Sequence, residues 1–105
     1  MSLFGEWKTV TIAKSGTVSG AADLGRDYES LNIVIPGIDS ANISLQVSKD
    51  NSTFYALGDS DNYFEAGTGE INTTFNLFGW QYVKVVASAA QTTAARTIYV
   101  RGYRN

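Results

Sequence analysis

An oxygen-rich stretch in the middle of the chain is the densest group of side chains that could bind a metal ion. Asp59, Asp61 and Glu65 supply carboxylates there, and Ser60 and Asn62 add a hydroxyl and an amide. Ca²⁺ binds about six to eight such oxygens, but the stretch lacks the glycine and the distal bidentate glutamate of an EF-hand loop. The alternative is a solvated loop, in which Asp and Asn bond their own backbone. We expect no metal site, and Ca²⁺ at Asp59, Asp61 and Glu65 is the one case worth testing.

Histidine and cysteine are both absent from the 105 residues. Their absence removes the commonest general base, the commonest transition-metal ligand and every thiol nucleophile. The carboxylates of Asp23 and Asp50 are a conceivable pair for glycoside hydrolysis, yet each falls in an expected turn with no visible acid partner. We therefore expect no catalytic residue, no cofactor and no enzymatic activity.

The aromatic residues offer a binding chemistry instead. A flat platform for stacking sugar rings could be built from Trp7, Trp80, Tyr82, Tyr99 and Tyr103. Aromatic residues on strands more often pack in the core or between subunits, where Tyr and Trp combine a large area with a polar tip. The sequence favours this second interpretation and leaves sugar binding as an alternative.

The N-terminal segment carries more apolar residues than a free chain end usually keeps exposed. Leu3, Phe4 and Trp7 all precede the first expected turn. We expect residues 1–7 to form an arm that docks on a neighbouring molecule, and residues 8–105 to form one domain. The other expected protein contacts are the aromatic residues Tyr63, Phe64 and Tyr103.

Apolar and polar residues alternate in short runs from one end of the chain to the other. In 42–48, Ile43, Leu45 and Val47 fall on one side of an extended backbone, because successive strand side chains point to opposite faces. The same pattern predicts about eight strands, at 7–13, 17–24, 31–35, 42–48, 53–57, 70–77, 80–87 and 96–103. Strands at this spacing with turn residues between them indicate an all-β fold, a single antiparallel β-sandwich of jelly-roll type. The residues expected in its core are Val10, Ile12, Leu31, Ile33, Ile35, Ile43, Leu45, Val47, Phe75, Val83, Val85, Ile98 and Val100.

The composition indicates a neutral, hydroxyl-rich surface. Charged residues make up 17% of the chain, against about a quarter in average soluble proteins. The formal net charge is -2, and the eight Lys and Arg residues are scattered. Nucleic-acid binding needs clustered cations, so we expect no nucleic-acid partner. No apolar run approaches membrane-spanning length, and we expect no membrane partner.

Three segments resemble a family of small bacteriophage virion proteins. The first runs from Ser15 to Gly25, a strand of hydroxyl and small residues that ends in Asp-Leu-Gly, and is followed by an apolar strand from Leu31 that stops at Pro36. The second runs from Ile43 to Phe54, an alternating strand followed by a Ser-Xaa-Asp turn and Thr-Phe, with Asn51 where the family has Gly. The third runs from Tyr82 to Ile98 and is similar to the family's closing hairpin.

The resemblance implies a structural part of a phage particle, made in the bacterial cytoplasm and then built into the virion. We expect a capsid decoration or cement protein that contacts the major capsid protein and forms a homo-oligomer, a trimer in the simplest case. A tail, neck or fibre component is the alternative within this class. A carbohydrate-binding β-sandwich module is the alternative from another class.

Overall fold

A computed structural model describes residues 3–58, 63–68 and 71–104, without the side chains at positions 3, 4, 78 and 104. The described residues contain strands and turns but no helix, and so no helix that could cross a membrane. The strands are β1 (Leu3–Phe4), β2 (Lys8–Ile12), β3 (Ala22–Ile35), β4 (Ala41–Ser48), β5 (Tyr55–Ala56), β6 (Phe64–Gly67), β7 (Ile71–Ala87) and β8 (Arg96–Arg104).

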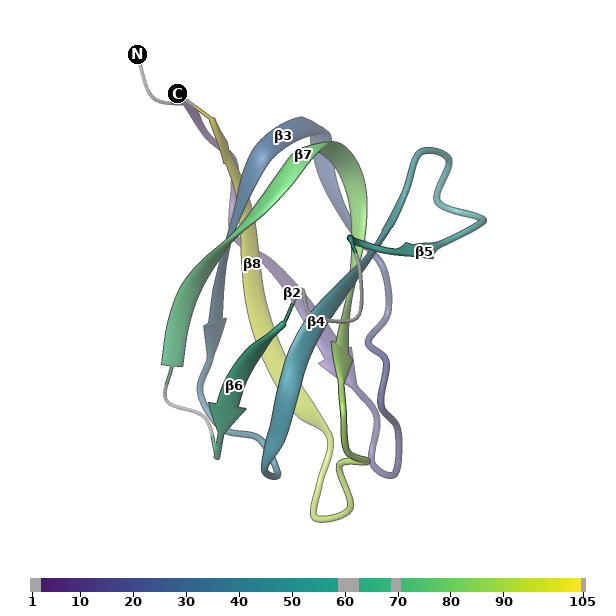
Figure 1. Ribbon diagram of the computed structural model, residues 1–105, viewed down its shortest axis with the longest axis vertical. Helices are drawn as coiled ribbons and strands as arrows, with labels where there is room; N and C mark the ends of the chain where they lie inside the picture. The colour runs from purple at the N-terminus through teal and green to yellow at the C-terminus, as the bar shows by residue number, and fades with distance from the viewer. Residues whose placement is uncertain (1–2, 59–62, 69–70, 105) are drawn as a thin grey trace.

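The eight strands form one antiparallel sheet that curls over to enclose a core. Its order is β1-β8-β3-β7-β4-β5, with β2 also paired to β8 and β6 to β4. The first part of β7 pairs with β3, and its last part pairs with β4. As Figure 1 shows, β3 and β7 arch together over the top of the molecule, so that β8 and β2 lie behind and β4 and β6 in front. The predicted all-β sandwich is thus confirmed.

Two of these strands are longer than the sequence predicts, because glycines bend them without ending them. Gly25, which follows the expected strand 17–24, has φ 89° inside β3, and Gly79, which lies between the expected strands 70–77 and 80–87, has φ 100° inside β7. Only glycine adopts such backbone angles without strain. The pairing of β3 with β7 shifts register on either side of Tyr28, at the bend. β3 and β7 can therefore each pass from one layer of the sandwich to the other.

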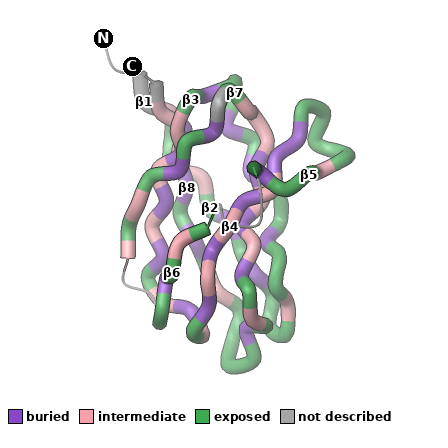
Figure 2. Tube along the Cα trace, in the orientation of Figure 1, coloured by how far each residue is buried: buried purple, intermediate pink, exposed green. Residues whose placement is uncertain are grey.

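Buried residues recur between more exposed ones along the strands (Figure 2), and their side chains make up the core between the two layers. All the residues that the alternation places in the core are buried. Leu77 and Ala87, which continue the alternation of Phe75 and Val85, are also buried. Other core residues come from segments with weaker patterns: Ala22, Leu24, Tyr28, Ile38, Ala41, Leu57 and Ala66. The buried polar residues Ser19, Ser48 and Gln91 are hydrogen-bonded, as burial requires: the Ser19 hydroxyl, for example, accepts a bond of 2.9 Å from the Val85 N–H.

Strand β6 lies between the expected strands 53–57 and 70–77, in a segment for which the sequence predicts a loop. It pairs with β4 through Ile43↔Phe64 and Asn42↔Glu65. Ala66 points into the core, whereas Glu65 is exposed. Four residues are too few for the alternation to be distinguished from a loop, and only the neighbouring strand β4 makes this segment extended.

Candidate functional site

The outward side of β8, β3 and β7 carries two rows of side chains that we call the outer face: Tyr99, Arg101, Asn32, Val34, Asn72 and Thr74, together with Trp7. The rows are set by register. Asn32 pairs with Arg101 on one side and Thr74 on the other, and Val34 pairs with Tyr99 and Asn72. Their neighbours in sequence, such as Ile33 and Val100, point into the core, so these residues must point outward.

One row of the outer face is a hydrogen-bonded polar ladder. The Nε of Arg101 donates to the Oδ1 of Asn32 at 3.0 Å, and the Nδ2 of Asn32 donates to the Oγ1 of Thr74 at 3.0 Å. The three side chains therefore hold one another in place across three strands. Because the Thr74 oxygen accepts from Asn32, its hydroxyl hydrogen remains able to donate to another group.

Two exposed aromatic residues flank the ladder. The guanidinium carbon of Arg101 lies 4.7 Å from the centre of the Trp7 ring, a cation–π contact that orients the indole. Trp7 is still 45% exposed and Tyr99 is 40% exposed. Together with Val34 they line a shallow hollow of about 370 Å³. A groove of about 300 Å³ continues from Trp7 along the ladder to Asn72.

The segment before Trp7 is held against β8 by a close packing of glycines around an aromatic ring. The Gly5 N–H donates to the Gly102 carbonyl at 2.9 Å, and β1 pairs with the end of β8 through Phe4↔Tyr103. The ring of Tyr28, which is 6% exposed, lies so close to both glycines that a Cβ would fall 2.8 Å from its Oη at Gly5 and 2.0 Å from its Cδ2 at Gly102. The described part of the arm thus extends the sheet and brings Trp7 to the outer face.

The expected protein-contact residues do not form one surface. Leu3, Phe4 and the partly exposed Tyr103 lie where β1 meets β8, whereas Tyr63, 44% exposed, precedes β6 on the side of β4. Phe64 turns inward: its ring is partly buried and lies 5.3 Å from the ring of Phe75. Of the five aromatic residues considered for a platform, the structure brings Trp7 and Tyr99 together, and Trp80 packs against the core.

Of the three candidate calcium ligands, only Glu65 lies in the described part of the chain. Asp59 and Asp61 lie outside the described residues, and Glu65 is exposed on β6. Within the described ranges, no three acidic side chains come together as a metal site.

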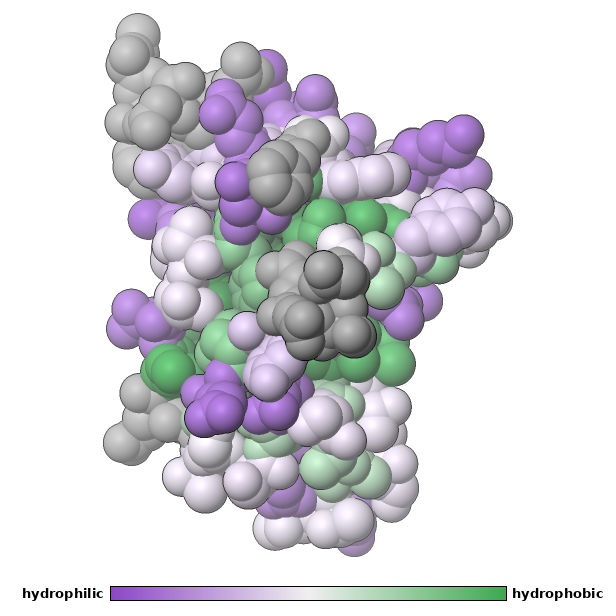
Figure 3. Space-filling view, viewed as in Figure 1, coloured by the Kyte–Doolittle hydropathy of each residue, from purple (hydrophilic) through white to green (hydrophobic). Residues whose placement is uncertain are grey.

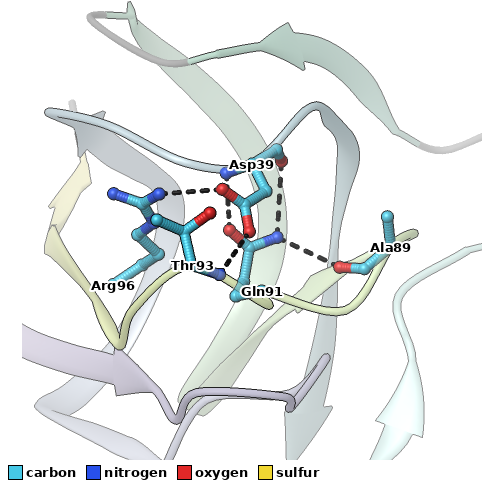
Figure 4. Close-up of polar contacts among 5 residues, drawn as sticks. All are labelled: Asp39, Ala89, Gln91, Thr93 and Arg96. Carbon is cyan, nitrogen blue, oxygen red and sulfur yellow. Dashed lines mark hydrogen bonds and ion pairs between the residues drawn. The ribbon is translucent and has the colours of Figure 1, made fainter.

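At the end of the sandwich away from the chain termini, polar groups join the loop between β3 and β4 to the loop between β7 and β8, an arrangement that we call the loop clamp (Figure 4). Asp39 accepts from the Nη2 of Arg96 at 2.8 Å and from the Thr93 N–H at 3.1 Å. The fully buried Gln91 accepts from the Asp39 N–H at 2.7 Å and donates to the Ala89 carbonyl at 3.0 Å. The bond from the Thr93 N–H, followed by that from Arg96, lowers the pKa of Asp39 to about 2.

Asp50 holds a turn in the same way, whereas Asp23 lies within β3, opposite Tyr82, and not in the turn that the sequence predicts. The Oδ1 of Asp50 accepts from the N–H groups of Ser52 and Thr53 at 3.0 and 3.1 Å, and these bonds lower its pKa. The pKa of Asp23 is lowered first by a bond from the Gln81 side chain and then by one from the Gly25 N–H. A general acid at neutral pH needs a raised pKa, so the lowered pKa values of Asp23 and Asp50 do not suit that role, and both carboxylates accept hydrogen bonds from backbone N–H groups.

The sequence did not reveal the polar ladder or the loop clamp. Alternation places Asn32 and Arg101 on outward faces, but it says nothing about which residue lies opposite which. Arg101 and Trp7 lie at opposite ends of the chain and meet only because β8 is the neighbour of β1, β2 and β3.

Comparison with known proteins shows the fold of the chain. No protein-family model and no curated protein matches the sequence. Among solved structures, the SPBc2 prophage-derived protein YomS is similar over 96% of this chain and 95% of its own, with a TM-score of 0.58 and 15% identity. The CBM32 domain of AlyQ, solved in complex with 4,5-unsaturated mannuronic acid, is similar over 90% of this chain and 76% of its own, with a TM-score of 0.58 and 11% identity.

A third similar structure is chitosan-binding module 1 from the chitosanase/glucanase of Paenibacillus sp. IK-5. It matches 89% of this chain and 75% of its own, with a TM-score of 0.57 and 14% identity. The β-sandwich is thus shared by a prophage-derived protein and by carbohydrate-binding modules.

Proposed function

We propose that the chain is a non-enzymatic structural protein of a phage particle, and specifically a decoration or cement protein on the capsid. The observation that carries the proposal is the similarity to YomS, which spans 96% of this chain and 95% of the prophage-derived one. The two proteins are therefore sandwiches of the same size. The matches to the sugar-binding modules leave about a quarter of each module's chain uncovered.

The surface chemistry supports a structural protein that functions by binding to other proteins. Three described carboxyls have shifted pKa values, and each of them accepts a hydrogen bond from a backbone N–H group: Asp23, Asp39 and Asp50. Hydrophobic residues gather in the middle of the face drawn in Figure 3, over β4. A hollow of about 470 Å³ on that side is lined by Leu57, Tyr63 and Val86 among other described residues. Exposed apolar patches of this kind mark interaction surfaces.

The contacts we propose are made by the Tyr63 side and by the end of the molecule where β1 meets Tyr103. They would join the chain to the major capsid protein and to further copies of itself, in a trimer in the simplest case. The protein would then reside in the virion.

Co-sedimentation with particles tests this proposal. Heads and tails of the phage that encodes the chain are separated on a gradient, and purified protein is added to each. We expect saturable binding to heads, weakened in Tyr63→Ala and unchanged in Tyr55→Ala, which removes a tyrosine that is 59% exposed and does not line the hollow. Binding to tails alone would make the protein a tail component, and binding to neither would reject a role in the particle.

Carbohydrate binding is the second candidate, favoured by the shared fold with the AlyQ and chitosan-binding modules. A glycan array on the same protein separates the two candidates. A clear glycan signal without any particle binding would move the chain to the sugar-binding class.

A further inference from the structure

The outer face combines groups that suit a sugar ring. A pyranose has one flat apolar face, which packs on aromatic rings, and a rim of hydroxyls that need donors and acceptors. The hollow between Trp7, Val34 and Tyr99 is apolar, and the adjoining groove is lined by the amides and hydroxyls of Asn32, Asn72 and Thr74. The apolar and polar parts lie side by side on rigid strands.

Contacts within the protein hold the ladder in place. Asn32 uses its carbonyl oxygen on Arg101 and one amide hydrogen on Thr74. Arg101 lies over the indole of Trp7, so the ring is oriented before a ligand arrives. A site whose groups are held in place loses little conformational entropy on binding, and that makes weak stacking contacts effective.

The charge around the two hollows indicates which sugars fit. Arg101 is the one charged residue among the described residues that line them, and no carboxylate is among those lining residues. A guanidinium favours a carboxylate in its vicinity and disfavours a cation. A uronic acid is therefore a better match than a neutral or an amino sugar.

We propose that the outer face is a binding site for an acidic polysaccharide, with one pyranose ring stacked between Trp7 and Tyr99 and its carboxylate directed toward Arg101. The inference goes beyond the proposed structural role and gives the carbohydrate-binding candidate a site and a ligand class. Neither Tyr63 nor Tyr103, which mark the two proposed docking regions, lines the two hollows, so a docked particle subunit would leave this face available for a surface glycan.

Calorimetric titration with an oligogalacturonate, and with a malto-oligosaccharide of the same length as its neutral counterpart, tests the site. We expect the oligogalacturonate to bind and the neutral oligomer to bind at least about fivefold more weakly, equivalent to about 1 kcal/mol. Tyr99→Ala should weaken binding of the acidic oligomer at least about fivefold, and Trp7→Ala should do the same. Tyr55→Ala, an exposed tyrosine outside the face, serves as the matched control and should bind like the unmodified protein.

Three results would overturn the proposal. They are no binding of either oligomer, equal binding of both, or binding that survives Tyr99→Ala and Trp7→Ala. Circular dichroism of each variant checks folding, and Tyr99→Ala keeps the test valid if Trp7→Ala unfolds. Particle binding is measured on the same variants. Loss of particle binding in Trp7→Ala without any glycan binding would assign Trp7 to protein docking, whereas failure of particle binding alone would reject only the structural role.

Discussion

Replacing Gly102 by alanine should destabilise the protein strongly, because the ring of Tyr28 occupies the space that a side chain would need. The new Cβ would lie 2.0 Å from Cδ2 and 2.3 Å from Cγ of that ring. Carbon atoms in contact are normally about 3.5–4.0 Å apart, so the ring would have to move by about 1.5 Å. Tyr28 is 6% exposed and packed in the core, so it has little room to move.

The expected loss follows from two limits. Overpacking that the core can absorb costs about 1–3 kcal/mol, and expelling an aromatic ring altogether costs about 3–5 kcal/mol. We expect Gly102→Ala to lower the free energy of unfolding by about 3 kcal/mol, which for a domain of this size lowers the melting temperature by about 10–20 °C. Urea and thermal unfolding followed by circular dichroism would measure both quantities.

Gly20→Ala is the matched control, because a Cβ there meets nothing within 4 Å. It should change the free energy of unfolding by no more than about 0.5 kcal/mol. In a Tyr28→Ala background the cost of Gly102→Ala should fall below about 1 kcal/mol, since the clash is gone. If Gly102→Ala costs no more than Gly20→Ala, or costs the same with and without the tyrosine ring, the packing argument is refuted.

Three further predictions concern the core, the loop clamp and a turn. Leu45→Ala should cost about 2–5 kcal/mol in urea unfolding, because Leu45 is 2% exposed and its loss leaves a cavity; a cost near zero would contradict its place in the core. The pKa of Asp39 is lowered from 3.8 to about 2. The ionised Asp39 carboxylate therefore adds to the free energy of unfolding above about pH 4, and this contribution is lost as the pH falls toward 2. Unfolding of Asp39→Asn should lack this part of the pH dependence, and parallel profiles for the two proteins would refute it. Asn51 has φ 59°, so Asn51→Val should lower thermal stability by about 1–2 kcal/mol while Asn51→Gly has little effect; equal melting temperatures for the two variants would contradict this.

How much of the candidate site could be predicted differs from residue to residue. The sequence identified Trp7 and Tyr99 as possible members of an aromatic platform, and the structure places them beside the same hollow. It also grouped them with Trp80, which packs against the core. Phe64 and Tyr63 are adjacent aromatic residues with the same expected role, yet one turns inward and the other outward. The orientation of an aromatic residue in a short strand depends on its partner strand, which the local sequence does not specify.

The sequence by itself determined which side of each long strand is buried. Alternation is a local property with a period of two residues, so Ile43, Leu45 and Val47, or Leu31, Ile33 and Ile35, face the core whichever strands lie beside them. The absence of histidine and cysteine likewise restricted the available chemistry without any knowledge of the fold.

Only the tertiary structure decided how these strands combine. Glycines such as Gly25 and Gly79 are typical of turns. Here they are bends inside β3 and β7, because strand pairing continues on both sides of them. The ladder from Arg101 through Asn32 to Thr74 depends on register between strands that are distant in sequence. Register is set by the packing of the whole core and by where the long strands bend, and neither is encoded in any single segment of the chain.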